Sequence, residues 1–259
     1  MTTRITVERD GHLLLIGFNR PDKRNAADFQ LLQELSLAYG ELERDPQLRA
    51  GLVFAHGDHF TGGLDLPDVA PRIGANGLDI VPAGGIDPWQ VSGPARTKPV
   101  VIAVQGICLT LGIELILASD IAVAAAGTTF AQIEVARGIL PFGGATLRFP
   151  KAVGWGNAMR WILTGDTFDA QEAHRIGLVQ EVVEDGSQYD RGLELARRVA
   201  AQAPLAVQAT LANARRAITD QDGAAAALQQ ELVRLAQSED ARIGMESFAT
   251  RTPAVFVGR

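Results

Sequence analysis

The chain has 259 residues, of which 47% are hydrophobic and 21% charged, and its formal net charge is −6. This length allows one large domain or two with a substantial buried core, while the acidic balance without a basic cluster argues against a nucleic-acid ligand. The single cysteine, Cys108, excludes an intramolecular disulfide, and four scattered histidines without ligand spacing argue against a metal site.

The N-terminal segment predicts a β-hairpin. Apolar runs at Ile5–Val7 and Leu13–Phe18 flank the pair Asp10-Gly11, which is typical of tight hairpin turns. The segment lacks the charged, apolar and small-residue regions of a secretion signal, so we expect a cytoplasmic protein.

A polar loop at 19–28 and a helix at 29–44 come next. Asp28 is placed to cap this helix, and five leucines are expected to form its apolar stripe: Leu31, Leu32, Leu35, Leu37 and Leu42. A short buried strand at Gly51–Ala55 leads into the glycine turn of "HGDHFTGGLDL". The Gly- and Pro-rich stretch 67–98 predicts a loop or loose helix that covers another part of the molecule.

The run Val100–Ala126 is the most apolar part of the chain, and Glu114 and Asp120 are its only formal charges. It is long enough to span a membrane, but these two carboxylates, Gln105 and the lack of a flanking Lys/Arg cluster argue against a membrane protein. We expect instead a sequence of short buried elements: a strand at 100–105, a helix at 110–118, and strands at 121–125 and 128–132.

The remainder of the chain is predominantly helical. Helical patterns start at Gly143, a strand-like "VQEVVE" ends near residue 183, and two or three helices over 189–249 are broken at Pro204 and around Asp220–Gly223. This order predicts an α/β core over residues 1–195 and a helical C-terminal region over 196–259.

Two glutamates in apolar surroundings, Glu114 and Glu134, are candidates for acid/base chemistry. Each stands beside a glycine turn, where burial favours the protonated form of a carboxyl unless partners hold the charge. A structural hydrogen-bond role is the alternative for either residue, and Glu134 could pair with Arg137 one turn later.

Five segments together resemble the crotonase superfamily, the enoyl-CoA hydratases and isomerases, over about residues 3–250. They are "FNRPDKRNAAD", "HFTGGLDL", "VVIAVQGICLTLGIELILASDIAVAA", "FAQIEVARGILPFGGATLRFPKAVG" and "LTGDTFDAQEAHRIGLVQEVV". The resemblance implies a crotonase-like α/β spiral of repeated ββα units, with a helical C-terminal region that forms a homotrimer or a hexamer. It also implies an acyl-CoA thioester substrate, with coenzyme A as part of the substrate and no separate cofactor.

The resemblance further implies an oxyanion hole of two backbone N–H groups, which map to Leu64 and Leu111. The family usually has a run of small residues where this chain has Thr110-Leu111-Gly112. Because Gly106 and Gly112 are present, we expect a reshaped acyl pocket rather than a lost donor.

By the same resemblance, Glu114 and Glu134 are the two catalytic carboxylates of a hydratase, 20 residues apart in the sequence. Because double-bond isomerases generally use only one such carboxylate, we expect hydration of a trans-2-enoyl-CoA to a 3-hydroxyacyl-CoA. The alternatives are an isomerase, an acyl-CoA hydrolase, or a catalytically silent CoA-thioester-binding oligomer.

The remaining site residues are implied in the same way. Contacts with coenzyme A map to Lys23, Arg24, Gly62, Asp65 and Leu66, and from a neighbouring subunit to Phe248 and Arg251. The acyl pocket is expected to include Trp89 and Phe142. Solvated charges for Lys23, Arg24 and Arg251, and core packing for Trp89 and Phe248, are the alternatives. His59 is expected to be a surface turn residue.

Overall fold

Two β-sheets form the centre of the molecule. The structure is a computed structural model that describes residues 3–75 and 77–259. The strands are β1 (Ile5–Asp10), β2 (Leu13–Phe18), β3 (Ala50–Ala55), β4 (Val100–Val104), β5 (Ile107–Leu109), β6 (Ile121–Ala125), β7 (Thr129–Ala131), β8 (Phe168–Asp169) and β9 (Glu181–Val183). The larger sheet has the order β1-β2-β3-β4-β6-β9, and the smaller has the order β5-β7-β8.

Helices surround these sheets and continue beyond them. They are α1 (Phe29–Arg44), α2 (Leu66–Val69), α3 (Leu111–Ala118), α4 (Ala145–Val153), α5 (Trp155–Thr164), α6 (Ala170–Ile176), α7 (Gln188–Ala200), α8 (Pro204–Ala217), α9 (Gln221–Ala236) and α10 (Glu239–Thr250). Single turns of 3-10 helix lie at Pro21–Lys23, Ala70–Arg72 and Glu134–Arg137. No helix within the described ranges is both long enough and apolar enough to cross a membrane.

The chain passes from the larger sheet to the smaller one at two neighbouring places. In the larger sheet β4 and β6 are parallel neighbours. β4 is followed in the chain by β5, through Gly106, and β6 is followed by β7, and β5 and β7 are parallel neighbours in the smaller sheet. Gly106 has a φ of 57°, and a Cβ there would overlap the carbonyl oxygen of Asp58. Only glycine fits this corner, and the result is the spiral of strand–strand–helix units that was expected.

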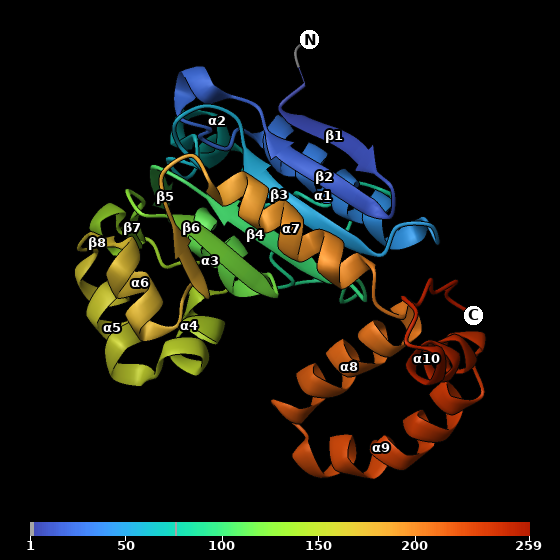
Figure 1. The fold of residues 1–259 in the computed structure, drawn as a ribbon. Helices are drawn as coiled ribbons and strands as arrows, with labels where there is room; N and C mark the ends of the chain where they lie inside the picture. The colour runs from blue at the N-terminus through green and yellow to red at the C-terminus, as the bar shows by residue number, and fades with distance from the viewer. Residues whose placement is uncertain (1–2, 76) are drawn as a thin grey trace.

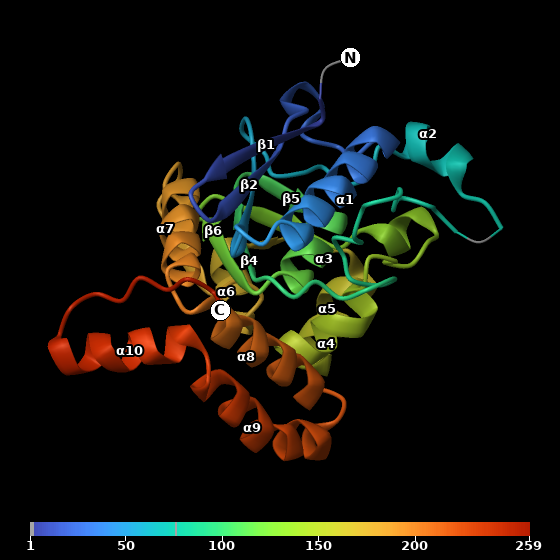
Figure 2. The same ribbon diagram turned by 90° about the vertical axis from the view of Figure 1, so that its right-hand side faces the viewer.

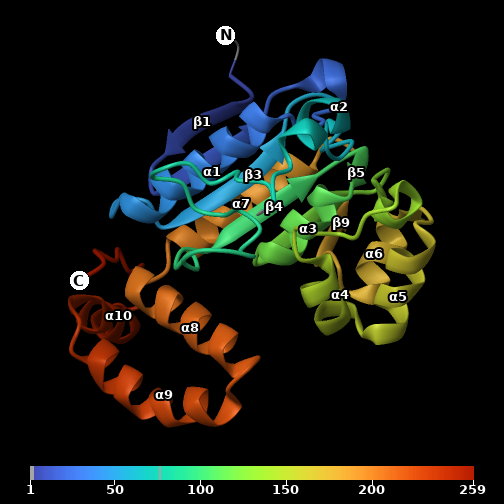
Figure 3. The same cartoon turned by 180° about the vertical axis from the view of Figure 1, so that it is seen from behind.

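Each face of the larger sheet is covered by a different helical layer. Figures 1 and 3 show α7 across one face and α1 and α3 across the other. On β2, Leu13 and Leu15 pack in the cluster under α7, while Leu14 and Ile16 join the larger cluster on the opposite side. Alternate side chains of a strand point to opposite faces, so a strand covered on both faces reads as the continuous apolar run seen in the sequence.

The N-terminal predictions are confirmed, with one exception. β1 and β2 form an antiparallel hairpin, and the Asp28 side chain caps α1 by accepting a hydrogen bond from the Leu31 amide at 2.9 Å. The assignment of Leu37 to the apolar stripe is wrong, because this side chain is 41% exposed. It lies two residues, or roughly 200°, from the buried Leu35 and so points away from the core.

The last three helices form an arm that projects from the core (Figures 1 and 2). α7 crosses the expected boundary at residue 195 and still packs against β3 and β4, so structurally the arm begins at Pro204. Within 189–249 the chain forms four helices rather than two or three, because α9 ends at Ala236 and the Ser238 hydroxyl caps α10 by accepting from the Ala241 amide. This N-cap signal was missed in the sequence.

Candidate active site

A mostly apolar cavity opens beside the start of α3. Its walls come from α1, the turn after β3, the 67–98 stretch, α3 and the segment before α4. The lining residues are Leu32, Leu64, Ile80, Asp87, Trp89, Val91, Ser92, Leu111, Glu114, Phe142 and Gly143. The 67–98 stretch therefore closes the cavity as expected, and both Trp89 and Phe142 line it. Trp89 is 4% exposed, so it is at once a core residue and a wall of the cavity.

The amide of Leu64 reaches this cavity from an extended segment that pairs with the loop before α1. The Ala27 amide donates to the Gly63 carbonyl at 2.8 Å, and the Asp65 amide donates to the Ala27 carbonyl at 2.9 Å. In this parallel pairing the Leu64 N–H has no acceptor in the described part of the chain. It is an unpaired backbone donor at the cavity wall, which is the requirement for an oxyanion donor.

The amide of Leu111 is unpaired for a different reason. Leu111 is the first residue of α3, and the first amides of a helix have no acceptor within it. Among the described residues no other group accepts from this N–H. The positive end of the helix dipole adds to its potential for binding negative charge.

The two segments that carry these amides are in direct contact. Gly63 has a φ of 97°, and a Cβ on it would lie 2.6 Å from Oγ1 of Thr110. Thr110 itself has a φ of 48° and a ψ of −110°, a backbone conformation that β-branched residues rarely adopt. A glycine at 63 thus permits the close approach that brings Leu64 and Leu111 to one cavity.

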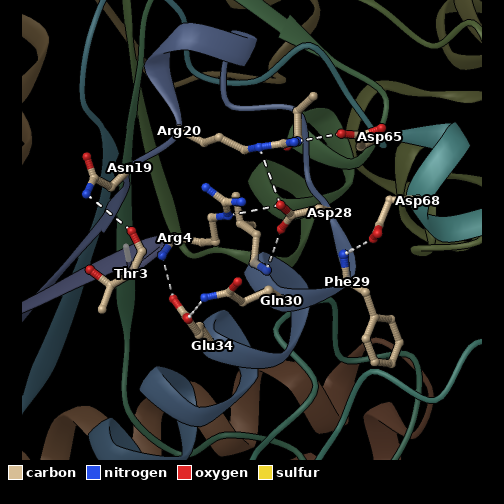
Figure 4. A network of polar contacts seen from close by, with 12 residues as sticks. Thr3, Arg4, Asn19, Arg20, Asp28, Phe29, Gln30, Glu34, Asp65 and Asp68 are labelled. Carbon is tan, nitrogen blue, oxygen red and sulfur yellow. Dashed lines mark hydrogen bonds and ion pairs between the residues drawn. The ribbon is translucent and has the colours of Figure 1, made fainter. Parts of the chain in front are cut away.

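A polar network supports the Leu64 segment from the side of α1 (Figure 4). Arg20 donates to Asp65 at 2.6 Å and lies 3.4 Å from Asp28, the residue that caps α1. Asp68 accepts from the amide of Phe29 at 2.8 Å. The Asp65 carboxylate is thus engaged in holding its own loop, and its contact with coenzyme A stays a prediction.

Glu114 lies on the first turn of α3 with its side chain at the cavity. It is 2% exposed, and its Oε1 accepts a hydrogen bond from the Ala145 amide at 3.0 Å. A Cβ on Gly143 would lie 2.6 Å from Oε2, so the glycine leaves room for the carboxylate. Burial, and next the nearby charge of Glu134, raise the pKa of Glu114 from 4.5 to about 7, although the Ala145 amide opposes the shift. The group therefore exchanges protons near neutral pH.

Glu134 begins the 3-10 helix after β7 and is 6% exposed. Its Oε1 accepts from Nε2 of Gln132 at 2.9 Å, whereas its buried Oε2 has no partner among the described residues. Burial raises the pKa of Glu134 above its usual value. The expected alternative, an ion pair with Arg137, does not occur within the described ranges.

Both carboxyl groups are buried, but they relate to the cavity differently. Glu114 lines it, while Glu134 is not among its lining residues and influences Glu114 through its charge. The negative charge of Glu134 raises the pKa of Glu114, so the protonation of Glu114 depends on the charge of Glu134. The arrangement can hold one proton and one negative charge beside the free amides.

The expected coenzyme A contacts fall into two groups. Lys23, Arg24 and Leu66 are exposed. The Gly62 amide donates to the Arg24 carbonyl at 2.8 Å, so the loop with Lys23 and Arg24 lies against the segment that carries Leu64. Phe248 and Arg251 lie on or just after α10, which every view places away from α3 (Figures 1 to 3), and Phe248 is 88% exposed.

The sequence analysis missed several residues near the site and placed His59 correctly outside the cavity. Asp87 and Gly143 line the cavity, and Gln132 binds Glu134. The only local signals were an acidic residue preceding a turn and a glycine pair after Phe142. His59 lies outside the cavity, with Nδ1 accepting from the Ile107 amide at 3.3 Å.

Comparison with known proteins agrees with the fold and the site. The family model for enoyl-CoA hydratase/isomerase matches residues 8–259. The chain is 54% identical to a probable enoyl-CoA hydratase/isomerase from Mycobacterium abscessus, whose crystal structure superposes with a TM-score of 0.95 and 99% coverage of both chains. An enoyl-CoA hydratase structure from Mycobacterium tuberculosis is 32% identical, with a TM-score of 0.89 and complete coverage of both chains.

A curated relative gives the same result. Enoyl-CoA hydratase EchA19 of Mycobacterium tuberculosis is 30% identical over 258 residues, which cover 98% of this chain and 96% of the relative. The architecture is thus that of a crotonase-fold enzyme acting on acyl-CoA thioesters. The chain belongs to the enoyl-CoA hydratase/isomerase family of the crotonase superfamily.

Proposed function

We propose that this enzyme is an enoyl-CoA hydratase, which adds water across the 2,3-double bond of a trans-2-enoyl-CoA to give a 3-hydroxyacyl-CoA. The observation that carries the proposal is the buried carboxyl of Glu114, which lines the same cavity as Leu64 and Leu111 with their unpaired amides and whose pKa is raised by burial and by the charge of a second buried glutamate, Glu134. Hydration needs both a group that takes a proton from water and a source of the proton that is added to Cα. Two coupled carboxyl groups provide both.

The proposed reaction begins with the thioester oxygen between the amides of Leu64 and Leu111. As the water oxygen bonds to Cβ, electrons of the double bond move toward the thioester carbonyl, and its oxygen gains negative charge. The two N–H groups stabilise this enolate because they are already oriented and need no reorganisation.

The carboxyl groups handle the protons. One carboxylate accepts a proton from the attacking water, and a proton from the same pair is delivered to Cα, so the pair returns to its starting charge. In this proposal the attacking water lies between the Glu114 carboxyl, which lines the cavity, and Oε2 of Glu134, which has no other partner among the described residues.

The binding of the rest of the substrate follows from the exposed residues. Lys23 and Arg24 provide positive charge for the phosphates of coenzyme A, next to backbone contacts at Gly62–Leu66, and no separate cofactor takes part. The apolar walls, with Trp89 and Phe142, receive the acyl group.

The proposed assembly is a homotrimer or a dimer of trimers formed through the arm. Large apolar side chains on the arm are exposed, among them Leu232 at 61%, Met245 at 65% and Phe248 at 88%. Burying them against another subunit is favourable, and it would let Phe248 and Arg251 contact coenzyme A in a neighbour.

The test is an absorbance assay of the conjugated thioester with crotonyl-CoA and longer trans-2-enoyl-CoAs, combined with mass spectrometry of the product. A hydratase removes the absorbance, and the product mass increases by one water. An unchanged mass identifies an isomerase, and release of free coenzyme A identifies a hydrolase. Binding without any reaction, unchanged in Glu114→Gln and Glu134→Gln, identifies a silent binding protein and refutes the proposal.

A further inference from the structure

A tight turn at Asp87–Ser92, called here the Asp87 turn, forms one wall of the cavity. The Asp87 carboxylate is 5% exposed and accepts three backbone hydrogen bonds, from the amides of Trp89 at 2.9 Å, Val91 at 2.8 Å and Ser92 at 2.8 Å. Such hydrogen bonds to an ionised group are the stronger kind, so they hold the turn in one conformation.

The turn directs the indole of Trp89 at the beginning of α3. Nε1 of Trp89 donates to the carbonyl oxygen of Leu111 at 3.0 Å, although the two residues are 22 positions apart. Both residues are buried, at 4% and 5% exposure. The bond therefore joins the Asp87 turn to Leu111, which lines the cavity and has an unpaired amide.

The beginning of α3 needs such a support because its own capping is poor. Thr110, the N-cap residue, has a φ of 48°, its side chain makes no capping bond, and its buried Oγ1 has no partner in the described part of the chain. A residue in this region of backbone conformation is strained and persists only where its surroundings enforce it. Relaxation of Thr110 would rotate the peptide between Thr110 and Leu111, and the Leu111 N–H would turn with it.

A second tie links the same turn to the segment that holds Glu114. Arg148 donates to the Gln90 carbonyl at 2.6 Å and, more weakly, to the Gly143 carbonyl at 3.5 Å. The Asp87 turn is thus anchored from α4 as well as from within. Because the turn is anchored on both sides, the indole of Trp89 stays in place and restrains Leu111.

We propose that Trp89 is a positioning residue for the oxyanion hole, whose indole N–H holds the Leu111 carbonyl so that the Leu111 amide stays aimed at the thioester oxygen. This inference rests on the proposed function, because it requires Leu111 to be one of the two oxyanion donors. Asp87 acts one step further away, by holding Trp89.

The test compares Trp89→Phe with the wild-type enzyme in two measurements. The first is kcat and KM for trans-2-enoyl-CoA hydration. The second is the carbonyl stretching frequency of bound butyryl-CoA, isotope-labelled at its carbonyl carbon, measured by difference infrared spectroscopy at saturation. Butyryl-CoA has no double bond to hydrate, so the frequency reports only on hydrogen bonds to the carbonyl.

In the wild-type enzyme we expect the bound carbonyl to absorb at lower frequency than in free butyryl-CoA. Trp89→Phe should lose a large part of this shift and reduce kcat by about 10- to 100-fold, somewhat less than removal of a complete oxyanion donor, while KM changes less than about threefold. Asp87→Asn should move both measurements in the same direction by a smaller amount, and it replaces Trp89→Phe if that variant does not fold. Trp155→Phe, whose ring is 72% exposed on α5, is the matched control and should change neither.

A variant with the full frequency shift and wild-type kcat would overturn the inference and leave the oxyanion hole intact. So would a loss of thermal stability or a rise in KM without a change in frequency, since a purely structural tryptophan would have that effect. If the wild-type enzyme itself shows no shift in carbonyl frequency, the assignment of the oxyanion hole is wrong, and this inference is refuted as well.

Discussion

Replacing Glu114 by glutamine should stabilise the protein above neutral pH while it removes activity. In the folded state burial raises the pKa of Glu114 from 4.5 to about 7. Between these two values the folded state binds more protons than the unfolded chain, so the stability of the wild-type protein falls as the pH rises from about 4.5 to about 7. Glutamine has the same shape and no charge to bury, so it does not suffer this loss.

The magnitude follows from the size of the shift. At about 1.4 kcal/mol per pKa unit, a carboxylate with this pKa destabilises the folded state at pH 8 by about 3 kcal/mol. The buried amide of glutamine still needs hydrogen-bond partners, so we expect a net gain of about 1–3 kcal/mol. For a chain of this length that corresponds to roughly 5 °C in the melting temperature.

The assay is differential scanning calorimetry of both proteins at about pH 5 and about pH 8. The difference in melting temperature should be small at the lower pH and should grow at the higher one. Glu172→Gln is a control of opposite sign, because Arg175 holds the pKa of Glu172 below its usual value, and this variant should gain nothing at pH 8. A Glu114→Gln variant that is no more stable than wild type at pH 8, or that has the same advantage at both pH values, would refute the reasoning.

Three further changes test other parts of the site and the arm. Glu134→Gln should lower kcat by about 10²- to 10⁴-fold and, because Glu134 contributes to the raised pKa of Glu114, it should shift the pH-dependent loss of stability to lower pH in calorimetry. Gly143→Ala should lower kcat at least about tenfold with acyl-CoA binding retained in titration calorimetry, because the new Cβ would lie 2.6 Å from Oε2 of Glu114; wild-type kcat would contradict this. Arg215→Ala removes the bonds that tie α8 to the Arg96 carbonyl before β4 and to the Asp120 carboxylate between α3 and β6. It should cost about 1–3 kcal/mol and loosen the proposed assembly in light scattering, whereas Arg234→Ala, in an exposed pair within α9, should cost less than about 1 kcal/mol.

Most elements could be predicted because their signals are local. The hairpin at Asp10-Gly11, the Asp28 cap and the buried runs of β4 and β6 depend on neighbouring residues and on side-chain periodicity. Two exceptions were also local: Leu37 was grouped by composition rather than by helical angle, and the cap at Ser238 was overlooked. The short strands β5 and β8 of the smaller sheet were not expected.

The parts of the site that could not be predicted depend on contacts between distant segments. The hydrogen bond from Trp89 to Leu111 joins residues 22 positions apart, and the one from the Ala145 amide to Glu114 joins residues 31 positions apart. No periodicity in the chain encodes such a pairing, because it depends on how complete elements pack.

By itself the sequence singled out the residues that we propose to carry the chemistry: two glutamates in apolar surroundings, and glycines where a strand must turn into a helix. Apolar residues on both sides of a glutamate can be read from the sequence, and they predict that its carboxyl group is buried. Only the tertiary structure decided the consequences of that burial, because a pKa and the direction of an N–H depend on every segment around the group. It brought Leu64 to Leu111 across Gly63 and Thr110, and it placed Glu114, but not Glu134, in the wall of the cavity.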